Sequence, residues 1–141
     1  MLLRMIIIMS SLFVSSCSDK LIHDVKFLDP VCIRAHHQYR YLTCHDVRVA
    51  IGSRMVVIPE GFDTDLASIP RILWPFMSPA YSDFIGPSIL HDYLYRDRTW
   101  MVRREVDDVF HDALITNGLD RWTAWKMWLA VRLFGNRFFL V

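Results

Sequence analysis

The sequence has little excess charge and contains few glycines and cysteines. Sixteen Lys and Arg residues against fifteen Asp and Glu residues give a formal net charge of +1. That balance argues against nucleic-acid binding, which needs a basic surface to displace counterions. The sequence has no internal repeat and no low-complexity segment, which excludes a repeat architecture. With 141 residues, 53% of them hydrophobic, the chain is predicted to form one folded domain rather than a disordered segment.

A short apolar stretch near the start is too brief to span a membrane. Arg4 precedes the mostly apolar residues Met5 to Val14, and about ten apolar residues do not cross a hydrocarbon layer of ~30 Å. Such a stretch is typical of a secretory signal. It ends in Val14-Ser15-Ser16-Cys17, which resembles the lipobox of bacterial lipoproteins.

The lipobox resemblance implies cleavage after residue 16 and lipidation of Cys17. Residues 1–16 would then be the signal peptide, residues 17–37 the anchor, linker and first strand, and residues 38–141 one globular domain. Ser18 rather than Asp after the Cys implies, by the sorting rule of Gram-negative lipoproteins, the periplasmic face of the outer membrane. The expected partner is membrane lipid, held through acylated Cys17. A plain signal peptide with an unrelated Cys is the alternative.

Two more cysteines, Cys32 and Cys44, follow this segment. In an oxidising periplasm they can pair as a disulfide, and free buried thiols are the alternative. A zinc site is disfavoured, because neither Cys has a second one at metal-ligand spacing.

The first half of the remaining chain is predicted to form strands. Strands are expected from Val25 to Leu28 and over residues 38–44, 46–51 and 54–58. Gly52-Ser53 joins the last two as a hairpin with a type II′ turn. Residues 59–82 contain several prolines among apolar residues, so we expect a long, ordered loop there.

The second half is predicted to form three helices. They are expected over residues 82–97, 103–117 and 121–134, from apolar residues at helical spacing. Gly118 is a natural residue to end the second helix, and Asp120 is a natural N-cap of the third. The predicted fold class is therefore α+β, with a small N-terminal antiparallel sheet followed by a three-helix core.

The candidate chemistry centres on His91 and Asp92. Adjacent helical residues point about 100° apart, so these two side chains must face different partners. If the next helix packs antiparallel, it brings Asp107 toward His91, where a carboxylate would hold the imidazole tautomer while the other nitrogen activates water. Asp108 leaves the register open by one residue, although the helical spacing favours Asp107. The alternative is that His91 is a hydrogen-bonded core residue and the carboxylates only pair with arginines.

Residues 56–135 closely resemble a domain family of unknown function found in phages, prophages and bacteria. The resemblance implies little biochemistry, because that family has no settled activity. The residues that carry it are Val57 to Phe62, Thr64-Asp65-Leu66-Ala67-Ser68-Ile69-Pro70-Arg71, His91 to Tyr95, Arg104 with Val106-Asp107, and Val131 to Gly135.

A more distant resemblance links the two helices to the prokaryotic secreted phospholipases A2. The shared pattern is His-Asp-x-x-Tyr-Arg on one helix, beginning at His91, and Asp-x-x-Phe on the next, beginning at Asp107. The resemblance implies that His91 activates water against a phospholipid ester, that Asp107 orients it and that Tyr95 assists. This would make the protein a lipid ester hydrolase.

The same resemblance implies a Ca²⁺ ion held by Asp92, Asp65 and the Leu66 carbonyl. The ion would polarise the ester and stabilise the oxyanion. The sequence departs from this family in two ways: Leu90 stands where those enzymes have a Cys, and their glycine-rich Ca²⁺ loop is absent.

Two other hypotheses compete with hydrolysis by this His/Asp pair. A metal phosphohydrolase of the His-Asp type is disfavoured, because it needs an upstream helical His and His36 and His37 lie in a strand-like region. A non-enzymatic, phage-related envelope lipoprotein that binds a partner or modifies the host is the second hypothesis. The aromatic residues after position 121 fit either a core or a lipid interface, and core packing is favoured for Trp125 and Trp128.

Overall fold

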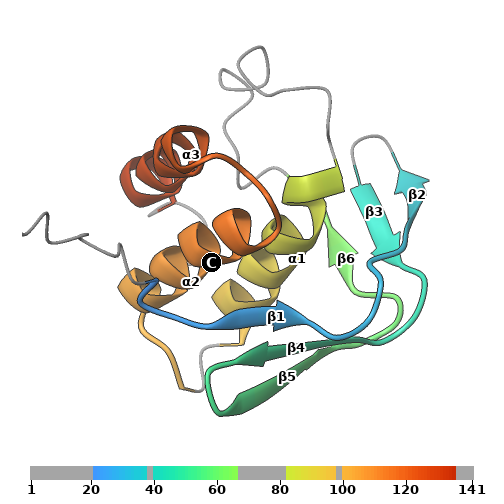
Figure 1. Cartoon of the computed structure of the whole chain (residues 1–141). Coiled ribbons are helices and arrows are strands. Elements are labelled where there is room, and N and C mark those ends of the chain that lie inside the picture. The colour runs from blue at the N-terminus through green and yellow to red at the C-terminus, as the bar shows by residue number, and fades with distance from the viewer. Residues whose placement is uncertain (1–20, 38–39, 67–81, 98–99, 136–141) are drawn as a thin grey trace, which may run out of the picture.

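The computed structural model describes residues 21–37, 40–66, 82–97 and 100–135 (Figure 1). The expected signal segment, Cys17, most of the expected loop and residues 136–141 lie outside the described residues. Among the described residues, no helix combines the length and the apolar character needed to cross a membrane.

Two small antiparallel sheets form the N-terminal half (Figure 1). The strand order is β1-β4-β5 in the first sheet and β2-β3-β6 in the second, and every strand pair is antiparallel. The strands are β1 (Val25–Phe27), β2 (Ile33–His37), β3 (Arg40–Thr43), β4 (Val47–Ile51), β5 (Arg54–Ile58) and β6 (Asp63–Thr64).

The β4–β5 hairpin agrees with the sequence prediction. Val47, Val49 and Ile51 alternate along β4 and are buried, because successive strand residues point to opposite faces. Gly52 has a φ of +57° and Ser53 has no positive φ, as a type II′ turn requires. The buried face of this hairpin packs against helices in the apolar core.

Three helices follow, within one residue of their predicted bounds. They are α1 (Ser82–Arg96), α2 (Arg103–Thr116) and α3 (Arg121–Phe134). Gly118, with a φ of +109°, ends α2 in a Schellman motif, in which Leu119 N–H donates to the Leu114 carbonyl. Asp120 caps α3 by accepting from Thr123 N–H at 3.0 Å.

Pro87 lies inside α1 and removes one backbone hydrogen bond from that helix. The carbonyl that loses its intrahelical donor is four residues earlier, on Asp83. Asn117 Nδ2, at the end of α2, donates to this carbonyl at 2.9 Å. The interruption in α1 thus becomes a contact that fixes α1 beside α2.

Helix α2 is the central element of the fold. One apolar cluster lies between the β1-β4-β5 sheet and helices α1 and α2, and a second lies between α2 and α3. In Figure 1, α3 accordingly lies on the side of α2 away from β1. The α+β class is confirmed. The largest side chains that fill these two clusters are Ile58, Ile89, Leu90, Leu94, Phe110, Leu114 and Met127.

Three details of the structure differ from the sequence predictions or settle an alternative that the sequence left open. The expected loop contains the short strand β6, which pairs with β3; two residues are too few to show a period of two. Cys32 and Cys44 form a disulfide with a Cα–Cα distance of 5.3 Å, which settles the open alternative. Trp125 is 41% exposed, so its assignment to the core was wrong, whereas Trp128 is half-buried.

Candidate functional site

The candidate site lies on the seam between α1 and α2. His91 Nε2 of α1 is 3.0 Å from Asp107 Oδ1 of α2, and both side chains are buried. The predicted approach of Asp107 to His91 is therefore present. The adjacent Asp108 turns toward α3, where it accepts from Trp128 Nε1 at 3.0 Å and Arg132 Nη2 at 2.7 Å. The register that the sequence left open is thus fixed on Asp107.

Tyr95 is the second donor to the same carboxylate oxygen. It lies one turn after His91 on α1, and its hydroxyl donates to Asp107 Oδ1 at 2.6 Å. Arg103 Nε donates in turn to the Tyr95 oxygen at 3.3 Å. Burial, together with the hydrogen bond to Asp107, raises the pKa of Tyr95. Tyr95 therefore acts as a persistent donor that holds the carboxylate in place.

The other oxygen of Asp107 faces arginine. Arg132 Nε of α3 lies 3.1 Å from Asp107 Oδ2, although neither atom has a hydrogen bond of good alignment. The contact is thus an attraction between charges rather than an in-line hydrogen bond. Because a buried carboxylate needs a compensating charge, Arg132, together with Arg103 at 4.0 Å from the same oxygen, explains how Asp107 is accommodated at 0% exposure.

The hydrogen bond to Asp107 fixes the tautomer of His91. A carboxylate only accepts, so the neutral imidazole must carry its proton on Nε2 and a lone pair on Nδ1. Nδ1 is buried and has no hydrogen-bond partner among the described residues. Ser88 Oγ, one turn earlier on α1, is also buried and has no partner there. A buried polar atom of this kind is one that a bound water or a polar ligand would satisfy.

Asp92 faces away from His91, toward the end of β6. The Thr64 hydroxyl donates to Asp92 Oδ2 at 2.5 Å, and the Thr64 oxygen accepts from Leu66 N–H at 3.2 Å. Leu66 has a φ of +50°, a left-handed conformation that is uncommon for a bulky residue. The expectation that His91 and Asp92 serve different partners is therefore confirmed, and Thr64 fastens the end of β6 to α1.

A guanidinium group lies among the carboxylates of this region. Arg40 Nε donates to both oxygens of Asp63, at 2.9 and 3.0 Å. Asp63 raises the pKa of Arg40 by this hydrogen bond and by its charge, and the charges of Asp65 and Asp92 raise it further. The positive charge of Arg40 thus already interacts with the two carboxylates that were expected to bind Ca²⁺.

The described residues alone do not complete a Ca²⁺ site. Calcium takes six to eight oxygen ligands, and the described part of the chain holds no group of three or more His, Cys, Asp or Glu side chains able to bind a metal. Asp92 accepts a hydrogen bond from Thr64, and the charge of Arg40 interacts with both Asp92 and Asp65. The expected ligand Leu66 follows Asp65 directly, and the sequence after it, residues 67–81, lies outside the described residues.

Sequence reasoning missed the parts played by Thr64, Ser88 and Arg132. One signal for Arg132 existed: Asp107 was predicted on an apolar helix face, and a buried carboxylate calls for a cation. The sequence does not say which arginine supplies it. Thr64 and Ser88 carry no comparable signal, since isolated hydroxyl residues are common on strands and helices.

The comparisons with known proteins concern the segment that contains this site. The family described as "Protein of unknown function (DUF1353)" matches residues 40–131, more than half of the chain. "Uncharacterized protein y4iH" of Sinorhizobium fredii is 37% identical over 75 residues, which are 52% of this chain but only 31% of that relative. No solved structure matches the chain. His91, Asp92, Tyr95 and Asp107 all lie in the matched segment, and the chain belongs to the DUF1353 family of proteins of unknown function.

Proposed function

We propose that this protein is an envelope lipoprotein that hydrolyses lipid esters, with His91 as the general base. One observation carries the proposal: His91 is held by Asp107 through Nε2, while Nδ1 has no hydrogen-bond partner among the described residues. A base needs a fixed tautomer and a lone pair available to a reacting proton. The phospholipase A2 resemblance of the same residues supports an ester as the substrate.

The proposed reaction uses water as the nucleophile. His91 Nδ1 takes a proton from water as the water oxygen attacks the ester carbonyl. The proton then passes from Nδ1 to the departing alkoxide as the ester C–O bond breaks, giving a carboxylic acid and an alcohol. Asp107 stabilises the transient imidazolium, as carboxylates do in hydrolases of this logic. Tyr95 and Arg132 keep Asp107 oriented and act as positioning residues.

Calcium remains part of the proposal only as an expectation from the resemblance. The ion would polarise the ester carbonyl, with Asp92, Asp65 and the Leu66 carbonyl as its proposed ligands. Because the described residues do not form that site by themselves, we assign no step to the ion. The activity assay below therefore includes arms with Ca²⁺ and with a chelator.

The proposed location rests on the N-terminal sequence. Cleavage after residue 16 and acylation of Cys17 would anchor the protein, by its Ser18 sorting signal, on the periplasmic face of the outer membrane. The disulfide between Cys32 and Cys44 supports this location, since disulfides persist in oxidising compartments. The acyl chains on Cys17 would then insert into a membrane whose phospholipid is also the proposed substrate.

A non-enzymatic role is the second candidate, and the burial of the site favours it. His91 is 1% exposed and Asp107 is 0% exposed, and contacts from α1 and α3 converge on Asp107. Such a network also serves to fix three helices in one arrangement. In that case, the protein is an envelope lipoprotein that binds a partner or modifies the host of a phage.

Fatty-acid release from phospholipid vesicles separates the two candidates. The assay has one arm with Ca²⁺ and one with EDTA, and we expect the purified full chain to release fatty acid in at least one of them. In that arm, His91→Gln should lower the rate by about 10²-fold or more. His111→Gln is the matched control, because His111, one turn after Asp107 on α2, pairs with Asp112 rather than with Asp107. Absence of release by the wild-type chain in both arms would establish the binding role instead.

A further inference from the structure

The outer face of α3 is apolar although no described element covers it. Trp122, Trp125, Leu129 and Leu133 recur at helical spacing, and Trp122 and Leu133 are 65% and 61% exposed. The rings of Trp122 and Trp125 stack with centroids 5.1 Å apart. The opposite face of α3 is buried against α2 through Ala124, Met127 and Val131. A helix that is apolar on both faces normally has a partner on each.

The charge on α3 has one sign. Residues 121–134 contain Arg121, Lys126 and Arg132 but no Asp or Glu. Arg132 turns inward to Asp107 and Asp108, which leaves Arg121 and Lys126 as the basic residues away from the core. Lys126 lies on the outer face, with Nζ 5.9 Å from the centre of the Trp122 ring. Exposed Trp and Leu beside basic residues are typical of helices that lie in a lipid interface. The N-cap Asp120 places one carboxylate at the N-terminal end of α3. The basic charge complements anionic headgroups.

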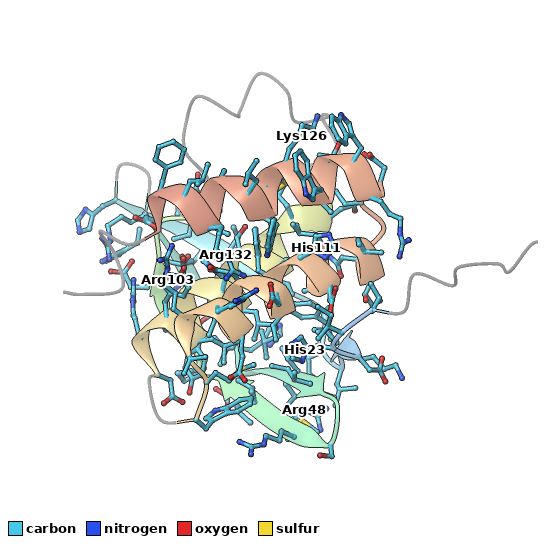
Figure 2. The ribbon with its side chains drawn as sticks, turned by 90° about the vertical axis from the view of Figure 1, so that its left-hand side faces the viewer. His23, Arg48, Arg103, His111, Lys126 and Arg132 are labelled. Atoms are coloured by element: carbon cyan, nitrogen blue, oxygen red, sulfur yellow. A yellow bond between two sulfur atoms is a disulfide. The ribbon has the colours of Figure 1, made fainter. Side chains whose placement is uncertain are left out.

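The start of the described chain lies beside α2, the helix on which α3 packs. His23 N–H donates to Asp112 Oδ2 of α2 at 2.7 Å, and the adjacent His111 ring meets Trp128 of α3 with ring centroids 6.4 Å apart. In the view of Figure 2, the labelled His111 of α2 lies between His23 and Lys126 of α3. Six residues lead from Cys17 to His23, and six extended residues span at most about 20 Å. An acyl group on Cys17 would therefore hold this part of the fold near the bilayer.

We infer that the outer face of α3 binds the surface of an anionic phospholipid bilayer, with Trp122 and Trp125 in the interface. The distance from Cys17 to His23 matters only if Cys17 carries the proposed anchor. The exposed apolar side chains of α3 and its basic residues do not depend on that anchor. Neither depends on hydrolysis. A second copy of the chain is disfavoured as the occupant, because two α3 faces of the same positive charge would repel each other.

Tryptophan quenching by lipids with brominated acyl chains tests this inference on the full chain. We expect quenching in vesicles of phosphatidylethanolamine and phosphatidylglycerol, and much less in vesicles of phosphatidylcholine. Lys126→Glu/Leu133→Glu keeps every tryptophan but places two carboxylates on the face. It should lower the partition into anionic vesicles by about tenfold or more, since each basic residue near such a surface is worth about 1 kcal/mol.

Arg34→Glu/Met55→Glu is the matched control, with the same change in net charge at two exposed positions on β2 and β5. It should leave quenching close to that of the wild type. Equal quenching in both double variants, or none in the wild type, would overturn the inference. So would a dimer that forms without lipid and is lost in Lys126→Glu/Leu133→Glu. His91→Gln should be quenched like the wild type, which separates this test from the fate of the hydrolase proposal.

Discussion

Arg132 of α3 places its Nε 3.1 Å from Oδ2 of Asp107 on α2. The carboxylate that contacts His91 is therefore also the point at which the third helix is fastened to the helix pair. Arg132 reaches further along α2, because its Nη2 atom bonds Asp108 Oδ1 at 2.7 Å and the Arg104 carbonyl at 3.0 Å. The candidate site and the packing of α3 thus depend on the same side chain.

Arg132→Leu is expected to destabilise the fold strongly, because it removes the nearer counter-charge of the buried Asp107 carboxylate and leaves only Arg103, whose Nε is 4.0 Å from Oδ2. The loss in unfolding free energy should be about 3 kcal/mol, as for other broken buried pairs. Urea unfolding followed by circular dichroism measures it. Arg104→Leu on the exposed side of α2 is the control and should change the stability by less than about 0.5 kcal/mol. Similar losses in both variants would show that Arg132 does not balance a buried charge.

The contact between His91 and Asp107 was predictable because it depends on local patterns. Helical spacing marks α1 and α2, and the short connection between them forces antiparallel packing, so His91 and Asp107 meet across one seam. Spacing relative to Phe110 also favours Asp107 over Asp108. The hairpin turn at Gly52 was predictable for the same reason, since the turn chemistry is contained in two residues.

The contacts between distant elements were not predictable from the sequence. Thr64 bonds Asp92 across 28 positions, and Asn117 Nδ2 bonds the Asp83 carbonyl across 34. No periodicity links such residues, because each contact depends on how whole elements dock. The pairing of Cys32 with Cys44 stayed open for a related reason: a spacing permits a disulfide but does not fix the geometry that forms it.

Tyr95→Phe is expected to change how stability depends on pH. The folded state raises the pKa of Tyr95, so the unfolded chain releases this proton first as the pH rises. The stabilisation is complete below the ordinary tyrosine pKa of about 10 and is lost as the pH climbs above it. In Tyr95→Phe, this part of the alkaline loss should be absent. Urea unfolding at about pH 9 and about pH 11 measures it.

Near neutral pH the same substitution has a second effect. Tyr95→Phe removes the hydroxyl that donates to Asp107 Oδ1, and a hydrogen bond to a charged group contributes about 1.5–3 kcal/mol. The variant should therefore be less stable than the wild type at neutral pH and approach it at alkaline pH. A difference in stability that stays constant across this range would contradict the proposed proton linkage.

Thr64→Val should loosen the end of β6 from α1. Valine keeps the shape of threonine but removes the donor to Asp92 Oδ2 and the acceptor for Leu66 N–H. Leaving a buried carboxylate short of a donor costs about 1–3 kcal/mol or more. Thr64→Ser retains the hydroxyl and is the matched control, with most of the stability preserved. If serine and valine lower the unfolding free energy equally, the packing of the methyl group matters more than the hydrogen bond.

Cys17→Ala tests whether the protein is held in the envelope by lipid. If Cys17 carries the acyl chains, the variant should lose labelling by radioactive palmitate when produced in Gram-negative cells. Wild-type processing should stop in the presence of globomycin, which blocks the lipoprotein signal peptidase. Cys32→Ala/Cys44→Ala removes the other two thiols and should retain the label, because both form the disulfide within the folded domain. Label that persists in Cys17→Ala would exclude this residue as the anchor, whereas label lost only there would establish it as the point of attachment.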